Sequence, residues 1–188
     1  MEGTTIISIV IAVIIAIIAI WLVNGYNGFI KMKNMAEEAF ATMDVYLKKR
    51  YDLIPNLVET VKGYAKHESG TFEKVVEARN IAQSANTIED KIAGENMLTG
   101  TLKSLFALAE AYPDLKANTN FMDLQKQLQK VEEDIANSRK YYNAIVREFN
   151  ILVESFPSNL IASVFKFVRK PMFEVEEEEE RQNVKVQF

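Results

Sequence analysis

The chain has 188 residues, of which 48% are hydrophobic and 26% are charged, and its formal net charge is −4. Nucleic-acid-binding surfaces are normally basic, so this acidic balance argues against a nucleic-acid-binding protein. The absence of cysteine excludes disulfide bonds, thiolate metal sites and cysteine nucleophiles, although it does not identify the compartment.

Residues 4–23 form an uncharged stretch that is rich in Ile and Val and contains no proline or glycine. A helix of this length rises about 30 Å, the thickness of the hydrocarbon core of a bilayer. A cleaved secretory signal would need a basic start, a shorter apolar core and small residues where Trp21-Leu22-Val23 stands. A lipoprotein signal would need a cysteine, and a buried core helix is seldom apolar on every face. The sequence therefore predicts a short leader at 1–3 and one uncleaved transmembrane helix, a signal-anchor, at 4–23.

The cationic residues near this stretch predict its orientation in the cell membrane. The leader has no Lys or Arg, whereas Lys31 and Lys33 follow the stretch closely. The positive-inside rule then places the N-terminus outside and the C-terminal part in the cytoplasm. Trp21 and Tyr26 stand where interfacial aromatic residues are expected on that side.

A first amphipathic helix is predicted between Phe29 and Arg50. Its apolar residues are spaced by threes and fours, as on one face of a helix: Met32, Ala36, Ala39, Met43 and Tyr46. The cationic run 48–50 would then complement the negative end of the helix dipole.

A second helix is expected to begin at Asp52, because Asp is a favoured N-cap and Pro55 is tolerated in a first turn. We therefore predict that the chain reverses at Asp52 and Pro55, between the first and second helices. The apolar spacing continues to Ala82, with an interruption near Glu68 and Gly70 that indicates either a bend or a polar contact.

Two further helices follow. Thr87, with Asp90 three residues later, is similar to a capping box and predicts a helix from Ile88 that ends before Pro113. After the polar connector at 113–120, the fourth and longest helix has a coiled-coil-like seam that implies nearly parallel helix packing. The seam residues are Phe121, Leu124, Leu128, Val131, Ile135, Ser138, Tyr142, Ile145, Phe149, Leu152 and Phe156. No segment has the alternation of a strand.

The predicted fold is therefore all-α, with an N-terminal transmembrane helix followed by an antiparallel up-down-up-down four-helix bundle at 29–156. This topology returns the short amphipathic segment 157–173 to the membrane side. Its candidate lipid contacts mix apolar and cationic side chains, with Val164 and Val168 interleaved: Ile161, Phe165, Lys166, Phe167, Arg169 and Lys170. A short helix that closes the open end of the bundle is an equal alternative. Residues 174–188 form an acidic tail, expected to be solvated or, less favoured, a docking tail for a partner.

No assembled chemistry is visible. A di-iron bundle needs a Glu-x-x-His pair on each of two helices, but His67 is the one histidine and Tyr64 stands three residues before it. Adjacent carboxylates such as those at 132–133 point in different directions on a helix. The glycines match neither a P-loop nor a dinucleotide fingerprint, although a Ser/Lys pair would leave no mark in the sequence. We therefore predict no catalytic residues, metal ligands or cofactor.

Several motifs together resemble the LemA family of bacterial membrane proteins. They are YLKKRYDLIPNLVETVKGYAKHE at 46–68, TFEKVVEARN at 71–80, AYPDLKAN at 111–118, FPSNLIA at 156–162 and a terminal KVQF. The resemblance implies one N-terminal span with a short outside N-terminus and a four-helix bundle. It implies no established activity, so there are no catalytic residues to transfer. The glutamate run of the tail is more acidic than is usual for this family.

The favoured function is a membrane-anchored helical-bundle scaffold or protein-interaction module without catalytic activity. The alternative is a self-associating, membrane-organising protein that contacts lipid through residues 158–173. An enzyme or cofactor carrier is disfavoured because so few ligating residues are present. The expected partners are the lipid bilayer and other membrane proteins or further copies of the chain.

Overall fold

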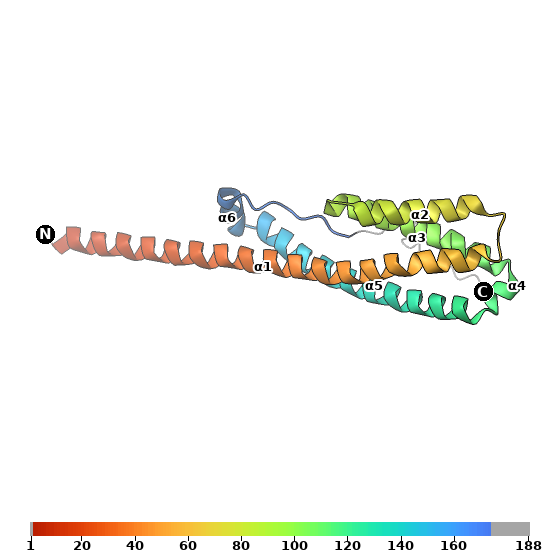
Figure 1. Cartoon of the computed structure of the whole chain (residues 1–188). Helices are drawn as coiled ribbons and strands as arrows, with labels where there is room; N and C mark the ends of the chain where they lie inside the picture. The colour runs from red at the N-terminus through yellow and green to blue at the C-terminus, as the bar shows by residue number, and fades with distance from the viewer. Residues whose placement is uncertain (1, 174–188) are drawn as a thin grey trace, which may run out of the picture. The chain divides into compact units, whose positions relative to one another are not determined.

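The computed structural model describes residues 2–173, and the regular elements in that range are all α-helices (Figure 1). They are α1 (Glu2–Lys62), α2 (Ser69–Ser84), α3 (Ile88–Glu110), α4 (Pro113–Lys116), α5 (Thr119–Glu154) and α6 (Ser158–Phe165). The prediction of an all-helical protein with one long apolar N-terminal helix is confirmed. The predicted acidic tail at 174–188 lies outside the described residues.

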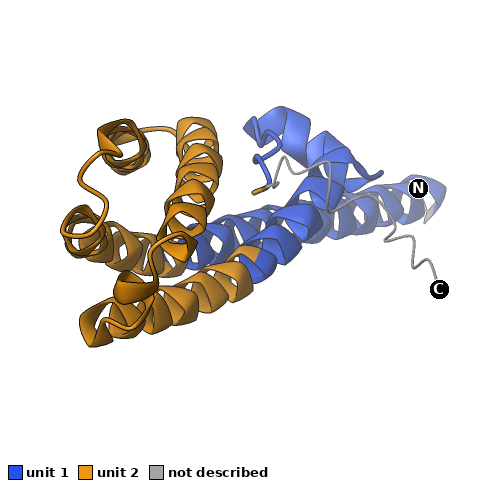
Figure 2. Cartoon of the chain, turned by 90° about the vertical axis from the view of Figure 1, so that its right-hand side faces the viewer, with its two compact units in different colours: residues 1–41, 140–172 blue, residues 42–139, 173–188 orange. Residues whose placement is uncertain are grey.

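Two compact units share the long helices (Figure 2). Unit 1 contains residues 1–41 and 140–172, and unit 2 contains residues 42–139 and 173–188. Helices α1 and α5 each contribute one part to unit 1 and another part to unit 2.

The apolar part of α1 has no packing partner in the described structure, since the side chains from 3 to 24 are all exposed. Among the described helices, α1 alone is long and apolar enough to cross a membrane, and none of its apolar window is buried. The free energy of exposing so many Ile and Val side chains to water would be large, which favours a lipid environment for this part.

In unit 2, the buried face of α1 runs straight past the predicted reversal. Residues spaced by threes and fours are buried along this part of the helix: Met43, Leu47, Arg50, Ile54, Leu57 and Val61. Asp52 and Pro55 lie inside α1, so the predicted turn at these residues is wrong. The chain leaves the helix at 63–68 instead, close to the interruption noted at Glu68.

Helices α2 and α3 pack closely through small residues. A β-carbon at Gly94 of α3 would lie 2.7 Å from the Cα atom of Ala82 in α2, so only glycine permits this approach. The predicted start of α3 is confirmed, because the Thr87 hydroxyl accepts a hydrogen bond from the backbone N–H of Asp90 at 3.0 Å.

The predicted seam of the fourth helix is the buried face of α5, from Phe121 to Phe149. Leu152 is half-buried, and α5 ends at Glu154. Phe156, the last predicted seam residue, follows the end of the helix and is 80% exposed.

We predict opposite effects for two substitutions of glycines in α3. Gly94→Ala should lower the free energy of unfolding by about 1–3 kcal/mol, because the new methyl group overlaps the backbone of α2. Gly100→Ala should raise it by about 0.5–1 kcal/mol, since nothing lies within 4 Å of that position and Ala is the better helix former. Thermal unfolding of the full chain in detergent, followed by circular dichroism, measures both. Equal effects would contradict the close approach of α2 and α3.

Candidate functional site

Pro55 lies inside α1 because another helix replaces the hydrogen bond that proline cannot make. In an α-helix the N–H of residue 55 would donate to the carbonyl oxygen of Tyr51, but proline has no N–H. Arg79 of α2 donates from its Nε to that same carbonyl oxygen at 2.7 Å. The backbone acceptor is therefore satisfied, and α1 continues to Lys62.

Arg50 is the centre of a buried ionic network in unit 2. Its side chain is 0% exposed, although it occupies a position on the apolar face of α1. Its Nη2 donates to Glu95 of α3, which is also fully buried, and its Nη1 donates to the two carboxylate oxygens of Glu132 of α5 at 2.8 and 3.1 Å. The Tyr51 hydroxyl donates to the second oxygen of Glu95. One guanidinium thus links three helices.

Burial shifts the pKa values of two groups in and beside this network. Burial raises the pKa of Tyr51 to about 12, with smaller and opposing contributions from nearby charges, so the phenol remains a neutral donor. Burial and the charge of Arg50 lower the pKa of Arg139, which lies over the ring of Phe173 at 4.8 Å. A buried ion pair adds little net stability, but one unpaired partner would be costly, so the network favours a single arrangement of these helices.

Arg50 is predicted from the sequence to complement the helix dipole, and Glu95 is given no role. The spacing of both residues nevertheless indicates that they belong to the core. The apolar spacing 43, 47, 50, 54, 57, 61 places Arg50 on the core face and continues through Pro55. On α3, Glu95 precedes Leu98 by three residues and lies on the buried face of the helix. A cation and an anion at core positions of two helices indicate a buried pair.

In unit 1, α6 packs its inner face on α1 and α5. Ile161 and Ala162 are buried together with Phe29 and Phe149. The ring of Phe167 stacks on Phe29 with centroids 4.6 Å apart. These contacts place α6 against the middle of α1 and against the last part of α5.

Glycine at position 25 admits α6, because a β-carbon there would overlap the Cδ1 atom of Ile161. Gly25 immediately follows the predicted span at 4–23. Phe165 lies against Tyr26 at the same level of α1, with ring centroids 4.7 Å apart.

The six candidate lipid contacts occupy different environments. Ile161 is 1% exposed and Phe167 is half-buried, so their side chains are packed against protein. Phe165 and Lys166 are exposed, and Arg169 is exposed and pairs with Glu154 at 3.0 Å. Lys170 lies 3.9 Å from Glu37, and its backbone N–H donates to Asn150 at 2.9 Å. Lipid contact stays a prediction, and Phe165, Lys166 and Arg169 are the candidates whose side chains are exposed.

The exposed apolar side chains around α6 include two that the sequence prediction of lipid contacts did not name. These are Phe156 and Leu160, which join Val164 and Val168. Residues 160 and 164 are one turn apart and lie on the same face of the helix. Which of the two apolar faces of α6 is buried depends on packing, which the sequence pattern did not resolve.

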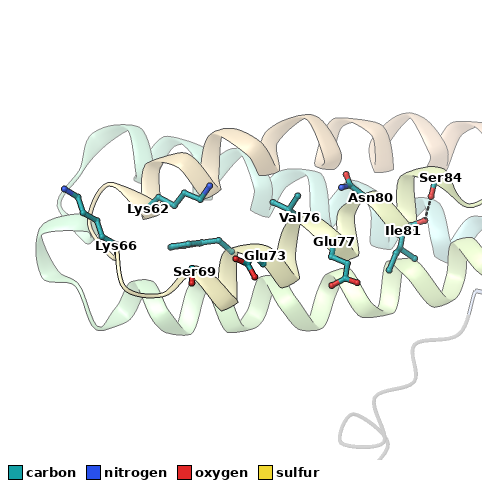
Figure 3. Close-up of a pocket in the computed structure, with 10 residues that line it drawn as sticks. Lys62, Lys66, Ser69, Glu73, Val76, Glu77, Asn80, Ile81 and Ser84 are labelled. Carbon is teal, nitrogen blue, oxygen red and sulfur yellow. Dashed lines mark hydrogen bonds between the residues drawn. The ribbon is translucent and has the colours of Figure 1, made fainter.

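A groove of about 1000 Å³ lies along α2 beside the end of α1 (Figure 3). Lys62 and Lys66 lie at one end, while Glu73 and Glu77 lie farther along α2, and the exposed Val76 is among the apolar lining residues. This surface suits a partner with both apolar and charged groups.

A smaller cleft of about 360 Å³ between α3 and α5 extends to Thr99 and Glu132, the outer members of the ionic network. Residues 2–173 contain no group of three or more His, Asp or Glu side chains that could hold a metal ion.

An all-helical chain with one apolar helix of membrane-spanning length is characteristic of a membrane-associated protein. The chain belongs to the LemA family, whose model matches residues 39–188. The matched range includes the buried network, both grooves and α6. The resemblance recognised from the sequence motifs is thus confirmed.

Individual relatives are distant in sequence, and the matched regions cover about two thirds of their own length. Magnetosome protein MamQ 2 of Paramagnetospirillum magneticum is 25% identical over 86% of this chain and 68% of its own length. Magnetosome protein MamQ of Magnetospirillum gryphiswaldense is 24% identical, over 81% of this chain and 65% of its own length. Protein LemA of Metamycoplasma hominis is 23% identical over 82% of this chain and 71% of its own length.

A double-mutant cycle tests whether Arg79 compensates for Pro55. Arg79→Ala in the natural chain should lower the free energy of unfolding by about 1–3 kcal/mol, because the Tyr51 carbonyl oxygen loses its donor. In a Pro55→Ala background the cost should fall by about 1 kcal/mol, since the restored backbone N–H at position 55 supplies the bond. Denaturant unfolding in detergent measures all four proteins. Additive effects would show that Arg79 does not serve this carbonyl group.

A second pair of glycine substitutions tests the docking of α6. Gly25→Val should displace Ile161 at a cost of about 1–3 kcal/mol, so hydrogen exchange of the α6 amides should accelerate by about an order of magnitude. Gly28→Val is the matched control, because nothing lies within 4 Å of that position. Exchange measured on the full chain in detergent should distinguish them. Unchanged exchange in both variants would contradict the packing of α6 beside Gly25.

Proposed function

We propose that this chain is a membrane-anchored helical scaffold that binds other membrane proteins and catalyses no reaction. The observation that carries the proposal is that α1 is one continuous helix, Glu2–Lys62. Its apolar N-terminal part is exposed, whereas its later part is buried among other helices. A continuous helix joins an anchor to a binding surface without a flexible linker.

The finer fold that we propose is an antiparallel four-helix bundle at 29–156. Its four helices would be the later part of α1 with α2, α3 and α5. The Arg50 network supports this arrangement because it joins α1, α3 and α5, and the close approach of Gly94 to Ala82 adds α2. We further propose that the N-terminus lies outside and the bundle in the cytoplasm, since Lys31 and Lys33 follow the span.

The relatives support a non-enzymatic role through their names. MamQ proteins are named for the magnetosome, and none of the relatives described above is named for a reaction.

The second candidate is a self-associating, membrane-organising protein. Apolar side chains exposed beside the end of the span favour it, among them Val164 at 73% and Val168 at 72% exposure. Large apolar groups at a surface commonly mark contacts with proteins or membranes.

Site-specific photo-crosslinking in native membranes distinguishes the two candidates. A photoreactive residue at Val76 in the α2 groove should form a discrete adduct with a different protein, if the chain is a scaffold. The control is Val45, which is 56% exposed on α1 but does not line the groove. Adducts only between two differently tagged copies would favour self-association. The same adducts from both positions, or none, would contradict the scaffold proposal.

A further inference from the structure

The outer face of α6 lies at the level where α1 would leave a bilayer. The residues of α1 that contact α6 are Gly25, Tyr26 and Phe29, all within six residues of the end of the span at 23. At 1.5 Å per residue these positions lie within about 9 Å of the hydrocarbon boundary. The polar headgroup layer extends about 5–8 Å beyond that boundary on each side. With residues 4–23 spanning the hydrocarbon core upright, Gly25 and Tyr26 therefore lie at the depth of the headgroup layer and Phe29 lies at its outer edge, which places α6 beside this layer.

This outer face is unusually apolar for a surface in contact with water. In α6 itself, Leu160 is 53% and Val164 is 73% exposed; in the flanking chain, Phe156 before the helix is 80% and Val168 after it is 72% exposed. The buried side of the same helix carries Ile161, which is 1% exposed. A short helix that is apolar on both sides has one side packed on protein and one side that needs another apolar environment.

Cationic side chains accompany these apolar residues. Lys166 ends α6 in the left-handed conformation, with φ of 58°, and its side chain is exposed. The side chain of Arg169 is 65% exposed although it pairs with Glu154. Long cationic side chains beside apolar groups suit the boundary between acyl chains and headgroup phosphates.

We propose that the exposed side of α6, with the chain on either side of the helix, is a second membrane contact, in which Leu160 and Val164 of α6 and the flanking Phe156 and Val168 enter the phospholipid interface. This inference rests on the proposed anchoring of residues 4–23. The occupant is the bilayer because this face adjoins the end of the span and combines apolar with cationic groups. Lipid is then bound by the exposed residues and not by the buried Ile161. The chain is held to the membrane at two places, the span at 4–23 and the exposed side of α6.

The absence of native cysteine allows a direct test with single nitroxide labels on the full chain. The label is placed at Val164→Cys, in vesicles of phosphatidylcholine and phosphatidylglycerol. Collisions with apolar oxygen and with a water-soluble nickel complex then report its surroundings. We expect an oxygen-to-nickel accessibility ratio several-fold higher at Val164 than at the control, Val45→Cys, which is exposed on α1 in unit 2.

A third label at Ile14→Cys separates failure of this inference from failure of the anchor. If Ile14 is in lipid but Val164 is as accessible to nickel as Val45, the anchor holds and the second contact is wrong. If Ile14 is also accessible to nickel, the anchor itself is wrong. Dipolar broadening at Val164 that disappears on dilution with unlabelled protein would assign the face to a second copy and overturn lipid binding.

Discussion

At Pro55, a side chain of α2 replaces the backbone hydrogen bond that α1 lacks. Pro55 removes the helical donor for the carbonyl oxygen of Tyr51, and Arg79 supplies another donor from α2. Without that replacement, a buried acceptor would be left unpaired at a cost of about 1–3 kcal/mol. Because the helix continues, Arg50 and Ile54 both lie on its buried face. The chain can then reverse after Lys62, and α2 begins at Ser69.

The core of unit 2 is specified by charge as well as by apolar packing. Leu47 and Ile54 flank Arg50 on α1, and a hydrophobic residue at position 50 would fill the core at a smaller desolvation cost. Arg50 instead requires Glu95 from α3 and Glu132 from α5. Because a buried charge without its partner is costly in free energy, this ionic network disfavours every arrangement of the helices that separates Arg50 from these carboxylates.

In unit 1, the position of α6 is set mainly by the packing of apolar side chains. Glycine at position 25 leaves room for Ile161, and the rings of Phe29, Phe149 and Phe167 pack around it. This packing sets the outer face of α6 beside the end of the apolar helix. Anchoring and packing are therefore coupled, because one helix provides both the span and the surface on which α6 rests.

The sequence alone determined the features that depend on near neighbours. The apolar run at 4–23, the capped start of α3 at Thr87 and the long seam of α5 are each visible in local composition and spacing. The motifs likewise identified the family. The predicted turn at Pro55 failed because the donor that makes the proline tolerable is on Arg79, 28 residues from Tyr51, and Glu95 is 45 residues from Arg50. Only the tertiary structure decided these pairings and which face of α6 is buried, since each depends on helices distant in the chain.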